Sequence, residues 1–130
     1  RLAGLPRQEN AALVCLGGVR YDLGDLAGSW ELRSQALALA RQIGHSYLEA
    51  YALLHLADIH HDRCEFEAEL VKLDEARERL LQLGDRVGAA NASNQRAAAL
   101  LAQGRLEEAI ASLKAGITEP AVDRWSPPGV

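Results

Sequence analysis

The chain has 130 residues, of which 48% are hydrophobic and 5% aromatic, and it carries a net charge of −4. That length fits one compact domain or a short array of repeats, and the mildly acidic balance gives no electrostatic reason to expect nucleic acid or a membrane as a partner. Its two cysteines fit a reducing compartment, no signal peptide is visible, and no stretch approaches the ~20 apolar residues that span a bilayer, so we expect a cytoplasmic protein.

Strong helix formers dominate the sequence and β-branched residues are sparse, which favours an all-α fold. The first predicted helix covers residues 8–23, because apolar and small residues recur there at the three- and four-residue spacing of one helix face. Gly24 suits a left-handed C-terminal position and ends this helix. The second predicted helix covers residues 26–44.

Two further pairs of helices are predicted along the chain. Their residues are 46–62 and 65–84, then 87–103 and 106–117. Ser46 is the predicted N-cap of the third helix, and Glu49 completes a capping box with it. Residues 118–130 contain three prolines and a glycine, and we predict a tail or linker there.

The sequence repeats itself at a spacing of 40 residues, which defines three units at about residues 8–44, 46–84 and 86–117. Three sets of positions show the register: the turn residues Gly24, Cys64 and Gly104, the small residues Gly17, Ala57 and Ala97, and the large residues Leu26, Phe66 and Leu106. The small residues allow the first helix of a unit to lie close to the second, and the large residues are expected to fill the space beside the turn. One such unit cannot bury its apolar face alone, so stacking of the units is expected.

These residues resemble the tetratricopeptide repeat (TPR) in its long bacterial form of about 40 residues per repeat. The pattern is carried by Leu13, Leu16, Gly17, Tyr21, Gly24 and Leu26, by Leu53, Leu56, Ala57, Ile59 and Phe66, and by Ala97, Leu100, Gly104, Leu106 and Ala109. The resemblance implies an α-α superhelix, a TPR-like solenoid of three helix-turn-helix repeats with six main helices, over residues 1–117. Residues 1–4 resemble the end of a preceding helix, and the chain begins with Arg rather than Met, so we expect a piece of a longer protein.

Some residues depart from the family pattern. Ser93 and Arg96 stand where the two earlier units have leucines, which makes the first helix of the third unit the least typical. Trp30 and Arg33 stand where the family is mostly smaller or apolar.

The resemblance implies that the first helix of each unit lines a concave groove that binds a peptide or partner protein. The expected groove residues are Tyr21, Tyr51, Asp58, His61, Asp62, Asn91, Asn94 and Gln95. No lysine lines this face, and it leans acidic, so a basic or neutral segment is the expected partner. The sequence therefore predicts a non-catalytic interaction module without a cofactor or metal, within a larger bacterial regulatory or signalling protein.

Two alternatives remain open. The first is a homo-oligomerisation module, in which exposed array ends pair into a homodimer. The second is a metal-binding or hydrolytic protein that uses His55, His60, His61 and Cys64, which lie within ten positions. The repeat register favours structural roles for these four residues, because Cys64 occupies a turn position and His60 a helix-packing position.

Overall fold

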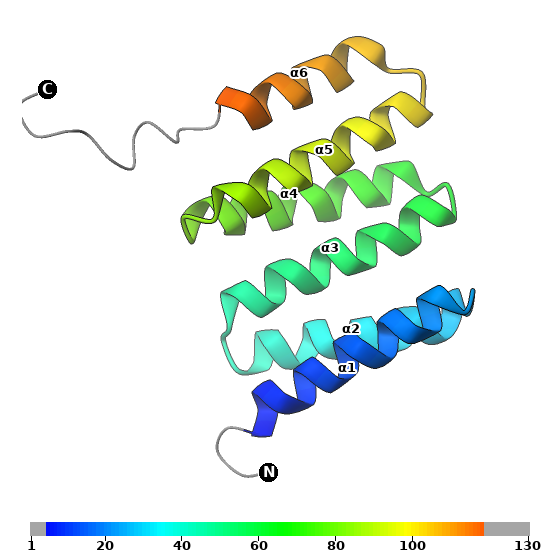
Figure 1. Ribbon diagram of the computed structural model, residues 1–130, viewed down its shortest axis with the longest axis vertical. Helices are drawn as coiled ribbons and strands as arrows, with labels where there is room; N and C mark the ends of the chain where they lie inside the picture. Colours follow the sequence, from blue (N-terminus) through cyan, green and yellow to red (C-terminus); the bar gives the residue numbers. More distant parts are fainter. Residues whose placement is uncertain (1–4, 119–130) are drawn as a thin grey trace, which may run out of the picture.

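The computed structural model describes residues 5–118, and this part of the chain is all α-helical. Its six helices are α1 (Leu5–Asp22), α2 (Leu26–Gln42), α3 (Ser46–Asp62), α4 (Phe66–Gln82), α5 (Arg86–Ala102) and α6 (Leu106–Thr118). They pack sequentially into antiparallel pairs, and they follow one another along the long axis of the molecule from α1 and α2 to α6 (Figure 1). The all-α prediction is confirmed.

A left-handed residue follows each of the first five helices. Four of these residues are glycines, and the residue after α3 is Cys64, with a φ of 59°. At the first turn, the N–H of Asp25 donates to the carbonyl of Arg20 (2.9 Å), and the N–H of Gly24 donates to that of Tyr21 (3.0 Å). This pair of bonds closes the helix end and reverses the chain, so the next helix returns antiparallel. The turns predicted at Gly24, Cys64 and Gly104 are therefore confirmed.

The start of α3 corrects one sequence prediction. Ser46 is the first helical residue rather than the N-cap, and the ring Nδ1 of His45 accepts from the N–H of Leu48 instead (3.2 Å). Glu49 does not close a capping box. Its nearly buried carboxylate accepts from Arg41 of α2 (3.0 Å) and pairs with Arg79 of α4 (3.1 Å), because tertiary ion pairs compete with the local cap.

The core lies around α3, which buries nine residues against its neighbours. Its centre is alanine and leucine from α3, α4 and α5: Ala50, Leu53, Leu54, Ala57, Leu73, Ala76, Leu80, Ala89 and Ala92. The small residues allow close helix contact, as predicted. At Gly17 the carbonyl accepts from the Ser29 hydroxyl of α2 (2.8 Å), and an added Cβ would lie 2.9 Å from Cγ of Arg33.

The other differences from prediction lie at helix ends. Helix α1 begins at Leu5 rather than residue 8, since Pro6 is tolerated in a first turn. Leu106 is 58% exposed and does not fill the space beside its turn, because no further helix in the described part of the chain covers α6. The predictions for residues 1–4 and for the tail at 119–130 lie outside the described residues.

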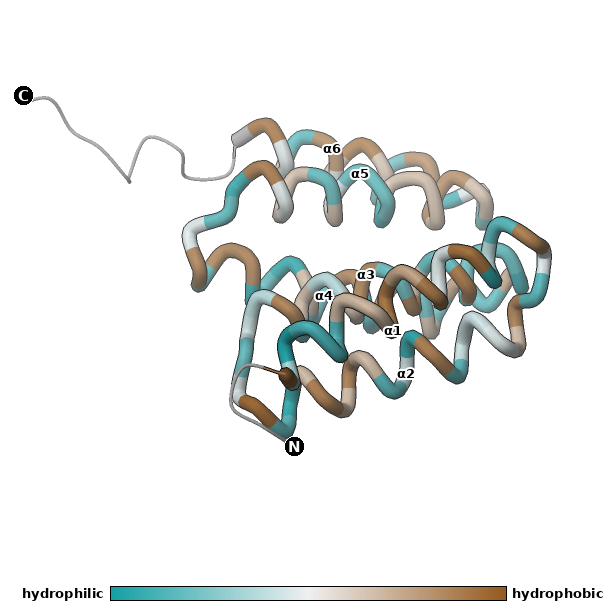
Figure 2. Tube along the Cα trace, turned by 60° about the horizontal axis from the view of Figure 1, so that its bottom comes forward, coloured by the Kyte–Doolittle hydropathy of each residue, from teal (hydrophilic) through white to brown (hydrophobic). Residues whose placement is uncertain are grey.

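Each helix mixes hydrophobic and hydrophilic residues along its length (Figure 2). Within residues 5–118, no helix is long and apolar enough to cross a membrane.

Candidate functional site

A small pocket of about 130 Å³ lies where α1, α3, α4 and α5 meet. Its lining is Tyr21, Asp58, His61, Asp62, Glu69, Gln95 and Ala98. Helix α3 contributes the most, because residues three and four apart lie on the same helix face. Five of the eight predicted groove residues thus line one pocket.

Tyr21 forms the α1 side of the pocket and is held by Arg33 of α2. The guanidinium carbon of Arg33 lies 4.7 Å from the centre of the tyrosine ring, in a cation–π contact, and its Nη1 donates to the carbonyl of His55 (2.7 Å). Burial, together with a hydrogen bond from the phenol to Asp62, raises the pKa of Tyr21 to about 12. The phenol therefore stays protonated and acts as a donor.

His61 and Glu69 close the pocket toward α4. The ring Nδ1–H of His61 donates to the Glu69 carboxylate, 3.0 Å from Oε1, and the ring meets Phe66 edge-on at 5.7 Å. Only 3% of Glu69 is exposed. Burial raises the pKa of Glu69, and the hydrogen bond from His61 opposes that rise. The carboxylate is thus held in a fixed orientation at the pocket wall.

Asp58 lies half-buried in the middle of the α3 face. Burial raises its pKa, and the neighbouring Asp62 raises it further, while Arg33 and His61 lower it. The pocket lining itself contains three carboxylic acids and no lysine or arginine. A group that carries positive charge would relieve the repulsion between Asp58 and Asp62.

Gln95 supplies an acceptor from α5. Its Oε1 atom is buried and makes no hydrogen bond with any described residue. Leaving a buried acceptor unpaired costs about 1–3 kcal/mol, so such atoms are uncommon in folded proteins. Together with the carboxylates, this oxygen makes the pocket suited to a hydrogen-bond donor with positive charge.

The other three predicted groove residues lie outside the pocket. Tyr51 stacks on Tyr47 with ring centres 5.0 Å apart, and both phenols donate to Asp85 Oδ2, at 3.1 and 2.6 Å. The hydrogen bond from Tyr47 is the main cause of the lowered pKa of Asp85. Tyr51 thus ties α3 to the turn before α5, whereas Asn91 and Asn94 are exposed on α5.

The histidines take separate places in the fold. His60 is nearly buried, its ring meets Trp30 edge-on at 5.0 Å, and its Nδ1–H donates to Glu65 (2.9 Å). His55 is largely buried, and burial, followed by the charge of Arg33, lowers its pKa. Cys64 is exposed in the turn. Among the described residues, no group of three or more His, Cys, Asp or Glu side chains is arranged to hold a metal ion.

Two residues important to the site were missed at the sequence level. Glu69 lies on the second helix of its unit, so no groove pattern includes it, and only the chain reversal at Cys64 brings it to His61. Arg33 could have been recognised from the sequence, because a long charged residue at a position that is normally small or apolar needs a buried partner.

Comparison with known proteins gives no further identification. No known family model matches the sequence, and a search of curated proteins finds no match.

Proposed function

We propose that the chain is a non-catalytic protein-interaction module that binds a basic side chain of a partner protein in the pocket between α1, α3, α4 and α5. The observation that carries the proposal is the pocket composition, in which three carboxylic acids and the unpaired Gln95 oxygen converge. Lysine and arginine side chains are donors with positive charge, and they complement such a lining.

The pocket size supports a single side chain rather than a larger ligand. A volume of about 130 Å³ lies well below the ~300–1,000 Å³ that is usual for small-molecule sites. The rest of a partner segment would lie along the polar surface of α5, where Asn91 and Asn94 are exposed and can bond to a peptide backbone.

The resemblance to long-form TPR units supports the wider role. Three two-helix units with matching turns, stacked as a solenoid, would form one surface from α1, α3 and α5, and such surfaces bind extended partners. We therefore propose a TPR-like array that serves as the partner-binding segment of a larger bacterial regulatory or signalling protein in the cytoplasm.

A titration with small basic probes tests this function. We would add ethylguanidinium or butylammonium to the labelled chain and follow backbone amide shifts by NMR, with butyrate as the acidic counterpart. We expect saturable shifts at Tyr21, Asp58 and Gln95 with the cations only. Asp58→Asn and Gln95→Leu should weaken binding, while Glu31→Gln, an exposed change on α2, should not. If both pocket variants bind the cations as the unmodified chain does, the proposal is wrong.

Self-association is a second candidate, because both end helices expose an apolar face. The exposed residues are Leu5, Leu16 and Val19 on α1 with Leu23 in the turn directly after it, and Leu106, Ile110, Leu113 and Ile117 on α6. In each helix they fall on one face at helical spacing. Sedimentation across a concentration series tests this: Leu16→Glu or Leu113→Glu should reduce any dimer, whereas Val71→Glu, at an isolated exposed position on α4, should leave it intact. A chain that stays monomeric throughout the series excludes self-association.

A further inference from the structure

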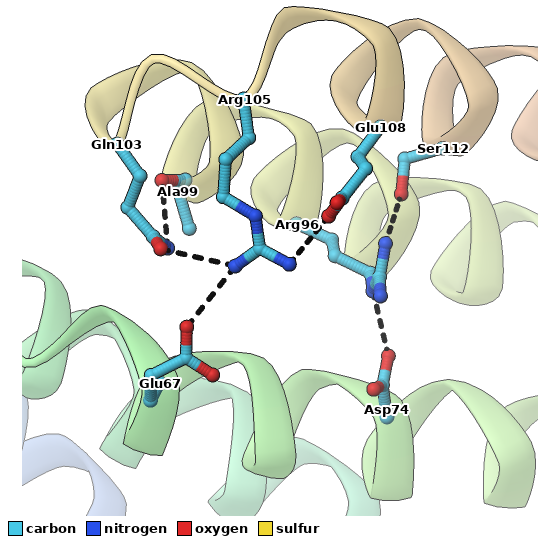
Figure 3. Close-up of polar contacts among 8 residues, drawn as sticks. All are labelled: Glu67, Asp74, Arg96, Ala99, Gln103, Arg105, Glu108 and Ser112. Atoms are coloured by element: carbon cyan, nitrogen blue, oxygen red, sulfur yellow. Dashed lines mark hydrogen bonds and ion pairs between the residues drawn. The ribbon is translucent and has the colours of Figure 1, made fainter.

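The contact between α4 and α5 joins the second helix of one sequence unit to the first helix of the next. Its apolar part brings Leu70 of α4 together with Ala99 of α5. At its rim, Arg96 of α5 donates from Nε to Asp74 Oδ1 of α4 at 2.8 Å (Figure 3). Because the sequence repeats every 40 residues, the α4 positions have counterparts on α6, and the α5 positions have counterparts on α1.

The outer face of α6 has the apolar positions of the α4 side of this contact. Ile110 stands 40 residues after Leu70, and it is 43% exposed where Leu70 is 6% exposed. Leu113 and Leu73 differ in the same way, at 40% and 1%. A hollow of about 300 Å³, lined by Ile110 and three neighbours on α6, opens at this face. Helix α6 therefore presents the apolar surface that α4 packs against α5, and no helix in the described part of the chain covers it.

The outer face of α1 has the apolar positions of the other side of the contact. Val19 is 54% exposed, although its counterparts Ile59 and Ala99 are completely buried. Leu16 is exposed to the same extent, whereas Leu56, its counterpart on α3, is only 2% exposed. On α5 this face packs against α4. Helix α1 therefore exposes a surface that is buried wherever a second helix precedes it.

The faces of α1 and α6 are thus two halves of one contact, and every copy of the chain carries both. A surface that matches itself gives a twofold dimer, whereas two different surfaces that match each other give head-to-tail association. Helices α1 and α6 lie toward opposite ends of the long axis, so a copy that uses one face leaves the other open (Figure 1). A second copy is therefore the occupant that this sequence itself supplies.

The rim of such a contact would differ from the rim between α4 and α5. Leu16 takes the position of Arg96, so the ion pair with Asp74 has no counterpart on α1. Association through α1 and α6 would then depend on apolar burial rather than on ion pairs. Since salt screens exposed charges and leaves apolar burial in place, added salt should not weaken the association.

We propose that copies of this chain associate head to tail, with α1 of one copy packed antiparallel on α6 of the next, as α5 packs on α4. In that contact Val19 takes the place of Ala99, and Ile110 takes the place of Leu70. The arrangement rests on the self-association proposed above and specifies which faces meet. It leaves the acidic pocket free, because the pocket lining includes none of these residues.

Mixing two blocked variants tests the arrangement by sedimentation. Leu16→Glu blocks α1, Leu113→Glu blocks α6, and each should weaken the association of the chain with itself about tenfold or more. An equimolar mixture of the two should form a one-to-one dimer and stop there, because each variant supplies the face that the other lacks. The unmodified chain should grow beyond a dimer as its concentration rises, in low or high sodium chloride, and Val71→Glu should behave in the same way.

Other results would separate this arrangement from self-association in general. If Leu113→Glu alone still dimerises while Leu16→Glu does not, α1 pairs with α1, and the reverse result means that α6 pairs with α6. Either result overturns the head-to-tail arrangement and leaves self-association standing, as does an unmodified chain that stops at a dimer or a mixture that stays monomeric. An unmodified chain that is monomeric at every concentration overturns both. Thermal melts check that the variants are folded.

Discussion

The ring of His61 on α3 donates from Nδ1 to the carboxylate of Glu69 on α4, with 3.0 Å between Nδ1 and Oε1. This bond joins the two helices of a pair at the wall of the acidic pocket. It also supplies a donor to a carboxylate that is almost completely buried.

Replacing that donor should destabilise the fold. His61→Phe keeps an aromatic ring beside Phe66 but leaves the Glu69 carboxylate without its donor from α3. We expect the free energy of unfolding to fall by about 1–3 kcal/mol in urea denaturation. The double variant His61→Phe/Glu69→Gln should regain part of the loss, because the buried charge is gone. Equal stability of His61→Phe and the unmodified chain would show that the bond contributes nothing.

Neutralising Asp58 should have the opposite effect on stability. Burial raises the pKa of Asp58 above its ordinary 3.8, so the folded state favours the protonated acid. The stability that protonated Asp58 gives to the fold is therefore lost as pH rises through the folded pKa. Asp58→Asn should therefore raise Tm at neutral pH by about 1–3 °C, and the gain should vanish below the unfolded pKa. Thermal melts across a pH series measure this. A lower Tm at neutral pH would show that ionised Asp58 does not destabilise the fold.

Two adjacent glycines on α1 should respond differently to alanine. At Gly17 a Cβ would lie 2.9 Å from Cγ of Arg33, whereas at Gly18 it would meet nothing within 4 Å. We expect Gly17→Ala to lower the free energy of unfolding by about 1 kcal/mol, because α1 and α2 must separate. Gly18→Ala should raise it by about 0.5–1 kcal/mol through helix propensity. Chemical denaturation of both variants checks the difference, and similar values would show that α1 and α2 are not in close contact there.

The turn residue Cys64 is the one described non-glycine residue with positive φ, at 59°. This conformation costs an L-residue about 1 kcal/mol, and glycine avoids the cost. Cys64→Gly should raise the free energy of unfolding by about 0.5–1 kcal/mol, after the added freedom of the unfolded chain is counted. Cys64→Val, which also removes the thiol, should lower it, since a β-branched residue fits this region poorly. A destabilised Cys64→Gly variant would indicate a role for the thiol itself.

Much of the architecture could be predicted from local signals. Glycines at turns and strong helix formers between them fix where helices begin and end, because these preferences act within a few residues. The prediction was wrong at Ser46, where the structure caps α3 with His45 and pairs Glu49 with arginines of α2 and α4. The local sequence pattern could not show that Glu49 pairs with distant arginines instead of closing a capping box.

The acidic pocket was likewise only partly predictable from the sequence. The acidic face of α3 was predictable, because Asp58, His61 and Asp62 share one helix face by spacing alone. Placing Glu69 and Gln95 beside them required the packing of α4 and α5, which joins residues distant in the sequence. The sequence also marked Ser93 and Arg96 as departures from its own repeat.

The sequence alone determined the helices, their turns and the residues that break the pattern, because such properties depend on neighbouring residues. Only the tertiary structure decided that those breaks enclose a hollow between α4, α5 and α6, and that Arg96 spans it from Asp74 to Ser112. Cavities and ion pairs depend on distances between helices, and those distances are set by the packing of the whole chain.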